Sequence, residues 1–151
     1  MSVYLPEFIR YLEESFSTRD LIHFKLAIEP LELGVSQAIP IALIINEAVT
    51  NSIKYAFPQK LTGTIEIVMQ KTKDLITLMI ADNGVGMATS LANLKSDSLG
   101  LKLMKGLSED INASIDIKND HGTKITIAFN VDLLQDSTNV LTKMEERPIY
   151  V

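Results

Sequence analysis

The sequence contains no cysteine and only two histidines, His23 and His121. The absence of cysteine excludes disulfide bonds, thiolate metal sites and a cysteine nucleophile, and two histidines are too few for a zinc site. The apolar run at residues 38–45 is too short to cross a bilayer and includes Pro40. Because the first residues are also unlike a signal peptide, we expect a cytoplasmic chain with no direct membrane contact.

Two common phosphate-binding motifs are missing as well. The sequence has no G-x-x-x-x-G-K-[ST] loop and no G-x-G-x-x-G turn that opens a helix. The net charge is −5 and the sequence pI is about 5.0, so the surface as a whole is not a footprint for nucleic acid. A small basic patch that holds phosphate groups is still compatible with this charge.

The composition suits one folded domain. The 151 residues are 46% hydrophobic, and both charge signs are spread along the chain, which argues against disorder. We expect the domain to span residues 1–131. Residues 132–151 have no firm pattern, and we expect this tail either to pack as a short helix or to be an end whose partner is absent.

Apolar spacing predicts the secondary structure of the domain. The expected helices cover residues 5–16, 36–57 and 99–111. The expected strands cover residues 23–28, 64–69, 75–81, 114–118 and 124–130. In the long second helix, we expect Ser36 to be the N-cap and Pro40 to be tolerated near the first turn. This order predicts an α+β two-layer sandwich, in which helices cover one face of a mixed, mostly antiparallel sheet.

The long second helix carries a polar stripe. Glu47, Asn51 and Lys54 follow one another at about 5–6 Å on one side, while Ala48 and Ser52 lie on the opposite stripe, which can pack on a sheet. An asparagine oxygen suits Mg²⁺ that bridges phosphates. Lys54 can neutralise phosphate charge, and Glu47 can accept a proton or position a nucleophile. A solvated polar face explains the same stripe, so the helix alone does not decide.

A carboxylate followed by glycines comes directly after an apolar strand, at residues 82–86 (D-N-G-V-G). Asp82 can accept a hydrogen bond from the exocyclic amine of adenine, and sites that bury such a polar group discriminate by about 10⁴ in favourable cases. Gly84 and Gly86 allow a sharp turn close to a base. Thr123, at the start of the last strand, can hydrogen-bond near Asp82. Ordinary turns account for both segments equally well.

Residues 98–101 (S-L-G-L) open the third helix. The free N–H groups and the positive dipole end of a helix suit phosphate groups, Gly100 permits a close approach, and Lys102 and Lys105 add positive charge. The weakly patterned stretch at residues 87–97 suits a mobile lid over a ligand. A serine-capped helix with an ordinary glycine is the alternative explanation.

Taken together and in this order, the segments at residues 46–55, 82–87, 98–102 and 121–123 resemble the ATP-binding (Bergerat) fold. Histidine kinases, gyrase-type ATPases, chaperone ATPases and mismatch-repair ATPases share this fold. The chain is most similar to the catalytic domain of two-component sensor histidine kinases, in the subclass whose helix reads N-E-x-x-x-N-x-x-K-Y-A-F-P, as residues 46–58 do here. Asn46 stands where relatives often have histidine.

The resemblance implies a site for ATP and Mg²⁺. Asn51 would be the Mg²⁺ ligand, Asp82 would read adenine, and Glu47 and Lys54 would be the catalytic residues. Glu47 would act either as a base or indirectly beside Mg²⁺. The implied nucleotide-binding residues are Asn51, Lys54, Tyr55, Asp82, Gly84, Gly86, Met87, Ser98, Leu99, Gly100, Leu101 and Thr123.

The resemblance also implies partners. Histidine kinases transfer the γ-phosphate to a histidine on a dimerising helical hairpin, for relay to a response regulator. This sequence shows no such hairpin, because His23 falls in an expected strand and His121 in an expected turn. We therefore expect a monomeric fragment of a homodimeric protein, or a family member that acts on a partner's histidine.

Two other functions are compatible with the same motifs. A stand-alone anti-sigma-factor serine kinase has this fold, a similar length and no histidine hairpin. A nucleotide-sensing module would bind ATP without transferring phosphate. A gyrase-type or mismatch-repair ATPase would need a following transducer domain, and none is visible in the sequence.

Overall fold

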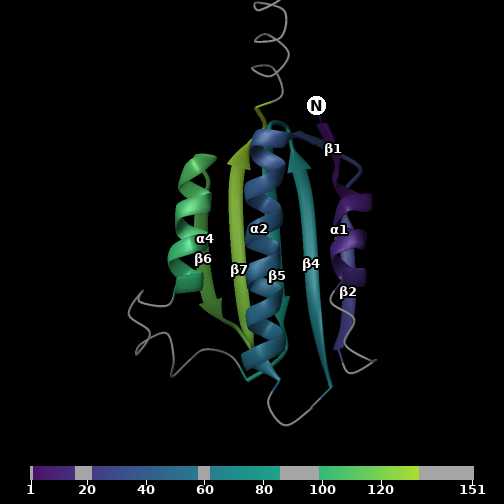
Figure 1. The fold of residues 1–151 in the computed structure, drawn as a ribbon, viewed down its shortest axis with the longest axis vertical. Coiled ribbons are helices and arrows are strands. Elements are labelled where there is room, and N and C mark those ends of the chain that lie inside the picture. Colours follow the sequence, from purple (N-terminus) through teal and green to yellow (C-terminus); the bar gives the residue numbers. More distant parts are fainter. Residues whose placement is uncertain (1, 16–21, 58–61, 86–98, 133–151) are drawn as a thin grey trace, which may run out of the picture.

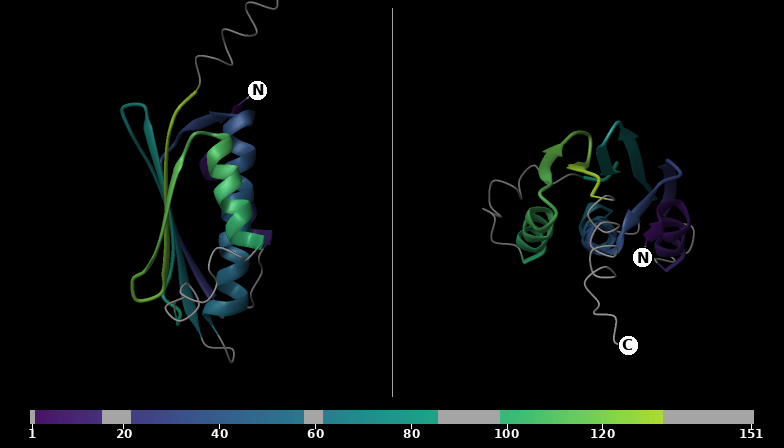
Figure 2. Two further views of the ribbon diagram at one scale, coloured as in Figure 1. Left: turned by 90° about the vertical axis from the view of Figure 1, so that its left-hand side faces the viewer. Right: turned by 90° about the horizontal axis from the view of Figure 1, so that it is seen from above.

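The computed structural model describes residues 2–15, 22–57, 62–85 and 99–132. Its main feature is a five-stranded sheet with helices on one face (Figures 1 and 2). The predicted α+β sandwich with a mixed, mostly antiparallel sheet is therefore confirmed. No helix in the described ranges is both long and apolar enough to span a membrane.

The sheet has the strand order β2-β4-β5-β7-β6. The strands are β2 (Ile22–Ile28), β4 (Gly63–Thr72), β5 (Leu75–Asp82), β6 (Ser114–Asn119) and β7 (Thr123–Asn130). β2 and β4 are parallel, and all other neighbours are antiparallel. Side chains alternate between buried and partly exposed along β4, β5 and β7, so each strand gives one face to the core.

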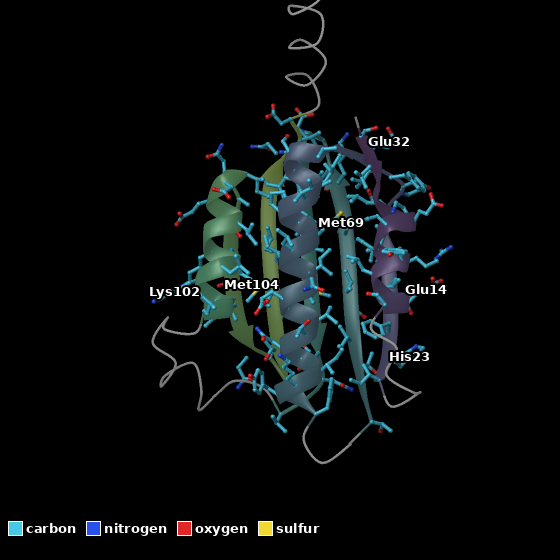
Figure 3. The ribbon with its side chains drawn as sticks, viewed as in Figure 1. Glu14, His23, Glu32, Met69, Lys102 and Met104 are labelled. Carbon is cyan, nitrogen blue, oxygen red and sulfur yellow. The ribbon has the colours of Figure 1, made fainter. Side chains whose placement is uncertain are left out.

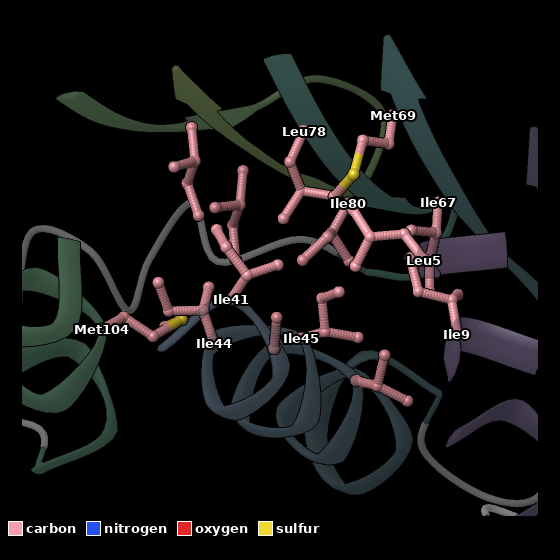
Figure 4. Packing of buried hydrophobic residues seen from close by; sticks show 14 of the residues in the cluster. Leu5, Ile9, Ile41, Ile44, Ile45, Ile67, Met69, Leu78, Ile80 and Met104 are labelled. Atoms are coloured by element: carbon pink, nitrogen blue, oxygen red, sulfur yellow. The ribbon is translucent and has the colours of Figure 1, made fainter. Parts of the chain in front are cut away.

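Among the described residues, three α-helices cover the sheet: α1 (Leu5–Ser15), α2 (Val35–Asn51) and α4 (Leu99–Asp110). α2 crosses the middle of the sheet, with α1 and α4 on either side of it (Figure 1). Its side chains Ile41, Ile44 and Ile45 are fully buried and point toward the sheet residues Leu78 and Ile80 (Figure 4). This packing fixes α2 on the sheet and places the polar residues at its carboxyl end.

The start of α2 differs from the prediction. The N-cap is Gly34, which makes no side-chain capping bond, and the helix begins at Val35, so Ser36 is not the cap. The reason is a small second sheet in which β1 (Ser2–Tyr4) pairs with β3 (Glu32–Gly34) and leads straight into the helix. Strands of three residues are too short to show an alternating pattern in sequence.

The end of the long helix differs as well. Instead of one α-helix to residue 57, α2 ends at Asn51 and continues as a π-helical turn, η1 (Ser52–Ala56). A π turn has wider i→i+5 hydrogen bonding and is frequent at functional sites. The wider turn changes the angular positions of the residues that follow Asn51.

Gln37, in the first turn of α2, ties this helix to the carboxyl end of β7. Its side chain is buried, donates from Nε2 to the carbonyl oxygen of Asn130 (2.8 Å) and accepts at Oε1 from the N–H of Asp132 (3.1 Å). The amide thus satisfies both of its hydrogen-bonding groups where helix and sheet meet. We infer that Gln37 contributes to the docking of α2 on the sheet.

We expect Gln37→Ala to lower the free energy of unfolding by about 1–3 kcal/mol, because it removes two hydrogen bonds in a buried place. Chemical denaturation monitored by circular dichroism measures this change. Gln70→Ala is the matched control, since Gln70 is exposed on β4. Equal stability of the two variants would contradict a structural role of the Gln37 amide.

Candidate functional site

The site centres on a buried carboxylate, that of Asp82 at the end of β5, which is 7% exposed. Its Oδ1 accepts hydrogen bonds from the backbone N–H groups of Gly84 (3.0 Å) and Thr123 (3.1 Å). Its Oδ2 accepts a hydrogen bond from the hydroxyl of Ser52 (2.7 Å). Three separate parts of the chain therefore meet on one side chain.

These bonds leave the two oxygens of Asp82 in different positions. A carboxylate has about four acceptor sites in all. Oδ1 already receives two backbone donors, whereas Oδ2 receives one hydroxyl. Oδ2 is therefore the oxygen with the greater capacity to accept a donor from a ligand.

The backbone packs tightly around this carboxylate, and glycine makes the packing feasible at two positions. A Cβ at Gly84 would overlap the carbonyl oxygen of Ala56, which accepts the N–H of Val85 at 2.9 Å. Gly122 has φ +134°, and a Cβ there would overlap the carbonyl oxygen of Asp82. The turn after β5 thus lies against η1 on one side and the start of β7 on the other.

Asn83 joins the turn after β5 to Thr64 on the neighbouring strand β4. Its Oδ1 accepts the N–H of Thr64 (2.7 Å), and its own N–H donates to the carbonyl oxygen of Thr64 (3.2 Å). The sequence interpretation gave Asn83 no role, although an asparagine between a strand and a glycine is a common turn signal.

The polar stripe of α2 faces the start of α4. Glu47 and Asn51 are both half-buried. A Cβ at Gly100 would overlap Oε1 of Glu47 and lie 3.3 Å from Nδ2 of Asn51. The absence of a side chain at Gly100 therefore allows the first turn of α4 to approach these two residues. The structure therefore brings Glu47, Asn51 and Gly100 together, although they come from two different helices.

Lys54 and Tyr55 differ from these residues because they belong to η1. Both side chains are exposed, Tyr55 to 70%. Lys54, three residues after Asn51, thus lies at the surface on a wider turn than a regular helix would have. It has the freedom to reach a ligand that lies over the end of α2.

In the first turn of α4, Leu101 is 5% exposed and packs in the core, whereas Leu99 is 83% exposed. A contact from Leu101 to a ligand would therefore have to come from its backbone. Lys102 points away from α2, on the outer side of α4, so it does not face Glu47 and Asn51 (Figure 3). Gly86, Met87, Ser98 and the expected lid at residues 87–97 lie outside the described residues.

The two histidines are surface residues. His23 is exposed on β2, at the edge of the sheet, and is remote from α4 (Figure 3). The side chain of His121 is 99% exposed, and its Nδ1 lies 3.2 Å from the carboxylate of Asp120 in the β6–β7 turn. Among the described residues, no side-chain hydrogen bond or ion pair joins either histidine to Asp82, Glu47 or Asn51.

Ser52 is a second residue, besides Asn83, to which the sequence interpretation gave no role in the site. The helical pattern placed it among side chains that pack on the sheet, and it is indeed buried at 8% exposure. Its hydroxyl bonds to Asp82, which is 30 residues away in sequence. A polar residue on an otherwise apolar stripe was the available signal.

This geometry can be compared with known proteins. The family model of the histidine kinase-like ATPase domain matches residues 18–129. The sensor histidine kinase PdtaS of Mycobacterium tuberculosis is 28% identical over 107 residues, which is 66% of this chain and 21% of PdtaS. DegS of Bacillus subtilis, a signal transduction histidine-protein kinase/phosphatase, is 30% identical over 126 residues, 82% of this chain and 32% of DegS. The chain spans between about a fifth and a third of these sensor kinases.

Another relative is matched over nearly its whole length. The anti-sigma F factor of Clostridium beijerinckii is 25% identical over 138 residues, 83% of this chain and 93% of that protein. Among solved structures, the histidine kinase domain of a blue-light-activated kinase from Erythrobacter litoralis superposes with a TM-score of 0.77 at 18% identity, covering 90% of this chain and 64% of that chain. The superposition shows the shared fold, and the family model covers most of the sequence. The chain therefore belongs to the histidine kinase-like ATPase family.

Proposed function

We propose that this chain is the catalytic domain of a sensor histidine kinase. It binds Mg-ATP and transfers the γ-phosphate to a histidine on a separate dimerisation and phosphoacceptor domain, for relay to a response regulator. The single observation that carries the proposal is the buried carboxylate of Asp82. Its Oδ2 accepts one hydrogen bond, from Ser52, and can accept another from a ligand. We further propose that residues 1–131 form the ATPase domain and that residues 132–151 are a tail outside it.

Asp82 fits the base of the nucleotide. Adenine carries an amino group at C6, which donates hydrogen bonds, whereas guanine carries a carbonyl oxygen there. Oδ2 of Asp82 accepts one bond from Ser52 and can accept a second from the amino group. In this proposal Gly84 contacts the base, Gly86 and Met87, outside the described residues, are further expected contacts, and Thr123 contributes through its N–H bond to Asp82.

The half-buried end of α2 fits the phosphates. Asn51 offers a side-chain oxygen of the kind that Mg²⁺ accepts, with phosphate oxygens as its other ligands. The described residues contain no cluster of three or more histidine, aspartate or glutamate side chains that would hold a metal without the nucleotide. Lys54 adds positive charge. The start of α4, where Leu99 and Gly100 are the first residues, presents the positive end of its helix dipole to the phosphates, and Ser98 and Leu101 are the adjoining residues proposed to bind them.

Phosphoryl transfer needs mainly positioning and charge neutralisation. Mg²⁺ would supply charge stabilisation at the phosphates when bound. Asn51, Lys54 and the start of α4 hold the phosphates in place, and Tyr55 flanks the nucleotide. Glu47, next to Gly100, either accepts a proton or orients groups beside the metal. In this proposal the acceptor imidazole comes from another part of a longer cytoplasmic, homodimeric protein, since His23 is exposed on β2 and the side chain of His121 is 99% exposed in the β6–β7 turn.

A second function is supported by a specific observation. The match to the anti-sigma F factor covers 93% of that protein, so a chain of about this size can constitute a whole protein with this fold. In that case the acceptor would be a serine on a protein partner. Nucleotide sensing without transfer would use the same base and phosphate contacts.

We expect Asp82→Asn to weaken ATP binding about 100-fold or more, because the new Nδ2 is a donor that opposes the donor of adenine. Isothermal titration calorimetry with Mg-ATP measures the affinity. Asparagine can still accept from Gly84 and Thr123, so the variant should unfold close to the wild-type temperature. If Asp82→Asn binds ATP as tightly as the wild type, the adenine assignment is wrong.

We expect Asn51→Ala to remove most of the increase in ATP affinity that Mg²⁺ causes, and to affect ADP less, because Asn51 would hold a cation that offsets the extra charge of the third phosphate of ATP. Titrations with Mg²⁺ and with a chelator give this difference for each nucleotide. Asn46→Ala is the matched control, since Asn46 is exposed on the same helix. Equal losses for ATP and ADP in the Asn51 variant would exclude Asn51 as the metal ligand.

The acceptor can be identified from the chemistry of the phosphorylated product. We expect the full-length protein that contains this chain, incubated with radiolabelled Mg-ATP, to carry a phosphate that is labile in acid and stable in base. A phosphorus–nitrogen bond to imidazole has this stability, whereas a serine ester is stable in acid. Glu47→Ala should reduce the labelling. An acid-stable label on a serine of a partner protein would favour the second function.

A further inference from the structure

We propose that Ser52 is a specificity-determining positioning residue, which makes the Asp82 end of the site accept an amino group and reject a carbonyl group. The proposal rests on the proposed binding of ATP at Asp82. It concerns a residue that acts on the base through Asp82, while Asn51, Lys54 and the start of α4 act on the phosphates.

The first argument is the direction of the hydrogen bond. Asp82 carries no hydrogen when ionised, so in the 2.7 Å bond between Ser52 Oγ and Asp82 Oδ2 the hydroxyl must be the donor. A serine hydroxyl has one hydrogen, and this bond uses it. Ser52 and Asp82 together therefore present lone pairs, and no donor, to a neighbouring ligand. Such a pair matches the amino group at C6 of adenine and opposes the carbonyl oxygen at C6 of guanine.

The second argument is the choice of partner. Serine in a helix usually bonds back to the carbonyl four residues earlier. Ser108 in α4 does so: it is 1% exposed, and its Oγ donates to the carbonyl oxygen of Met104 at 2.8 Å. Ser52 is also buried, at 8% exposure, but it bonds across the layers to the sheet instead. Its position at the start of η1, where the regular helix ends, accompanies this different choice.

The third argument is that the other donors are part of the main chain. Both bonds to Oδ1 come from backbone N–H groups, of Gly84 and Thr123, which anchor that oxygen whatever side chains are present. Ser52 is the side-chain donor to Oδ2, the oxygen that in this proposal accepts the amino group of the base. A change at position 52 therefore affects Oδ2 and leaves the two backbone hydrogen bonds to Oδ1 in place.

The test compares two ligands that differ in one group. ATP has the amino group at C6, and purine riboside triphosphate has a hydrogen there. If Ser52 holds Oδ2 where the amino group binds, Ser52→Ala should weaken Mg-ATP binding about tenfold, because a displaced Oδ2 forms a weaker hydrogen bond with the amino group. The same variant should change the affinity for purine riboside triphosphate by less than about twofold. Calorimetric titration of both nucleotides gives the four affinities.

Controls separate this role from a structural one. Ser108→Ala removes a buried hydroxyl elsewhere and should change neither affinity. Ser52→Cys, which has nearly the volume of serine but a weak donor, should reproduce the ATP-specific loss, and it serves if Ser52→Ala does not fold. Equal losses for both nucleotides, or no loss for ATP, would overturn the role of Ser52 while the ATP site stands. If the wild-type chain binds neither nucleotide, the proposed function fails instead.

Discussion

The constraint on which the site depends is the burial of an ionisable carboxyl group. An unpartnered buried carboxylate is costly, so Asp82 needs donors from several directions. The structure supplies them from η1, from the turn after β5 and from the first residue of β7. Each donor requires that its own element be docked correctly. The hydrogen bonds of one side chain therefore couple the helix layer to the sheet.

The register of the sheet brings these donors together. β5 and β7 pair with Ala81 opposite Lys124, which places Thr123 beside Asp82. The side-chain-free Gly122 lets the two backbones approach there, while Asn83 fixes the turn to Thr64 on β4. At the far end of the sheet, the first turn of α2 is tied to the end of β7. The fold thus holds α2 at both ends, and the position of Ser52 follows from that.

The long amphipathic elements could be predicted from sequence, and the short or irregular ones could not. β5 and β7 alternate over eight residues each, so periodicity locates them to within one or two residues. β1 and β3 have three residues each, and their pairing joins segments about thirty residues apart, which no local pattern encodes. The turn η1 has the composition of a helix. Glu47, Asn51 and Asp82 were predicted from motifs, whereas the bond from Ser52 to Asp82 depends on tertiary structure.

The two ends of the candidate site differ in how firmly the protein holds them. Around Asp82 the groups are buried and bonded to one another, so recognition of a base would need little rearrangement. Around Asn51 and Lys54 the side chains are half-buried or exposed. In the proposed function, the phosphates and the acceptor group meet at this less buried end. Sensor histidine kinases and an anti-sigma factor are both similar in sequence to this chain, so the sequence that they share does not by itself identify the acceptor.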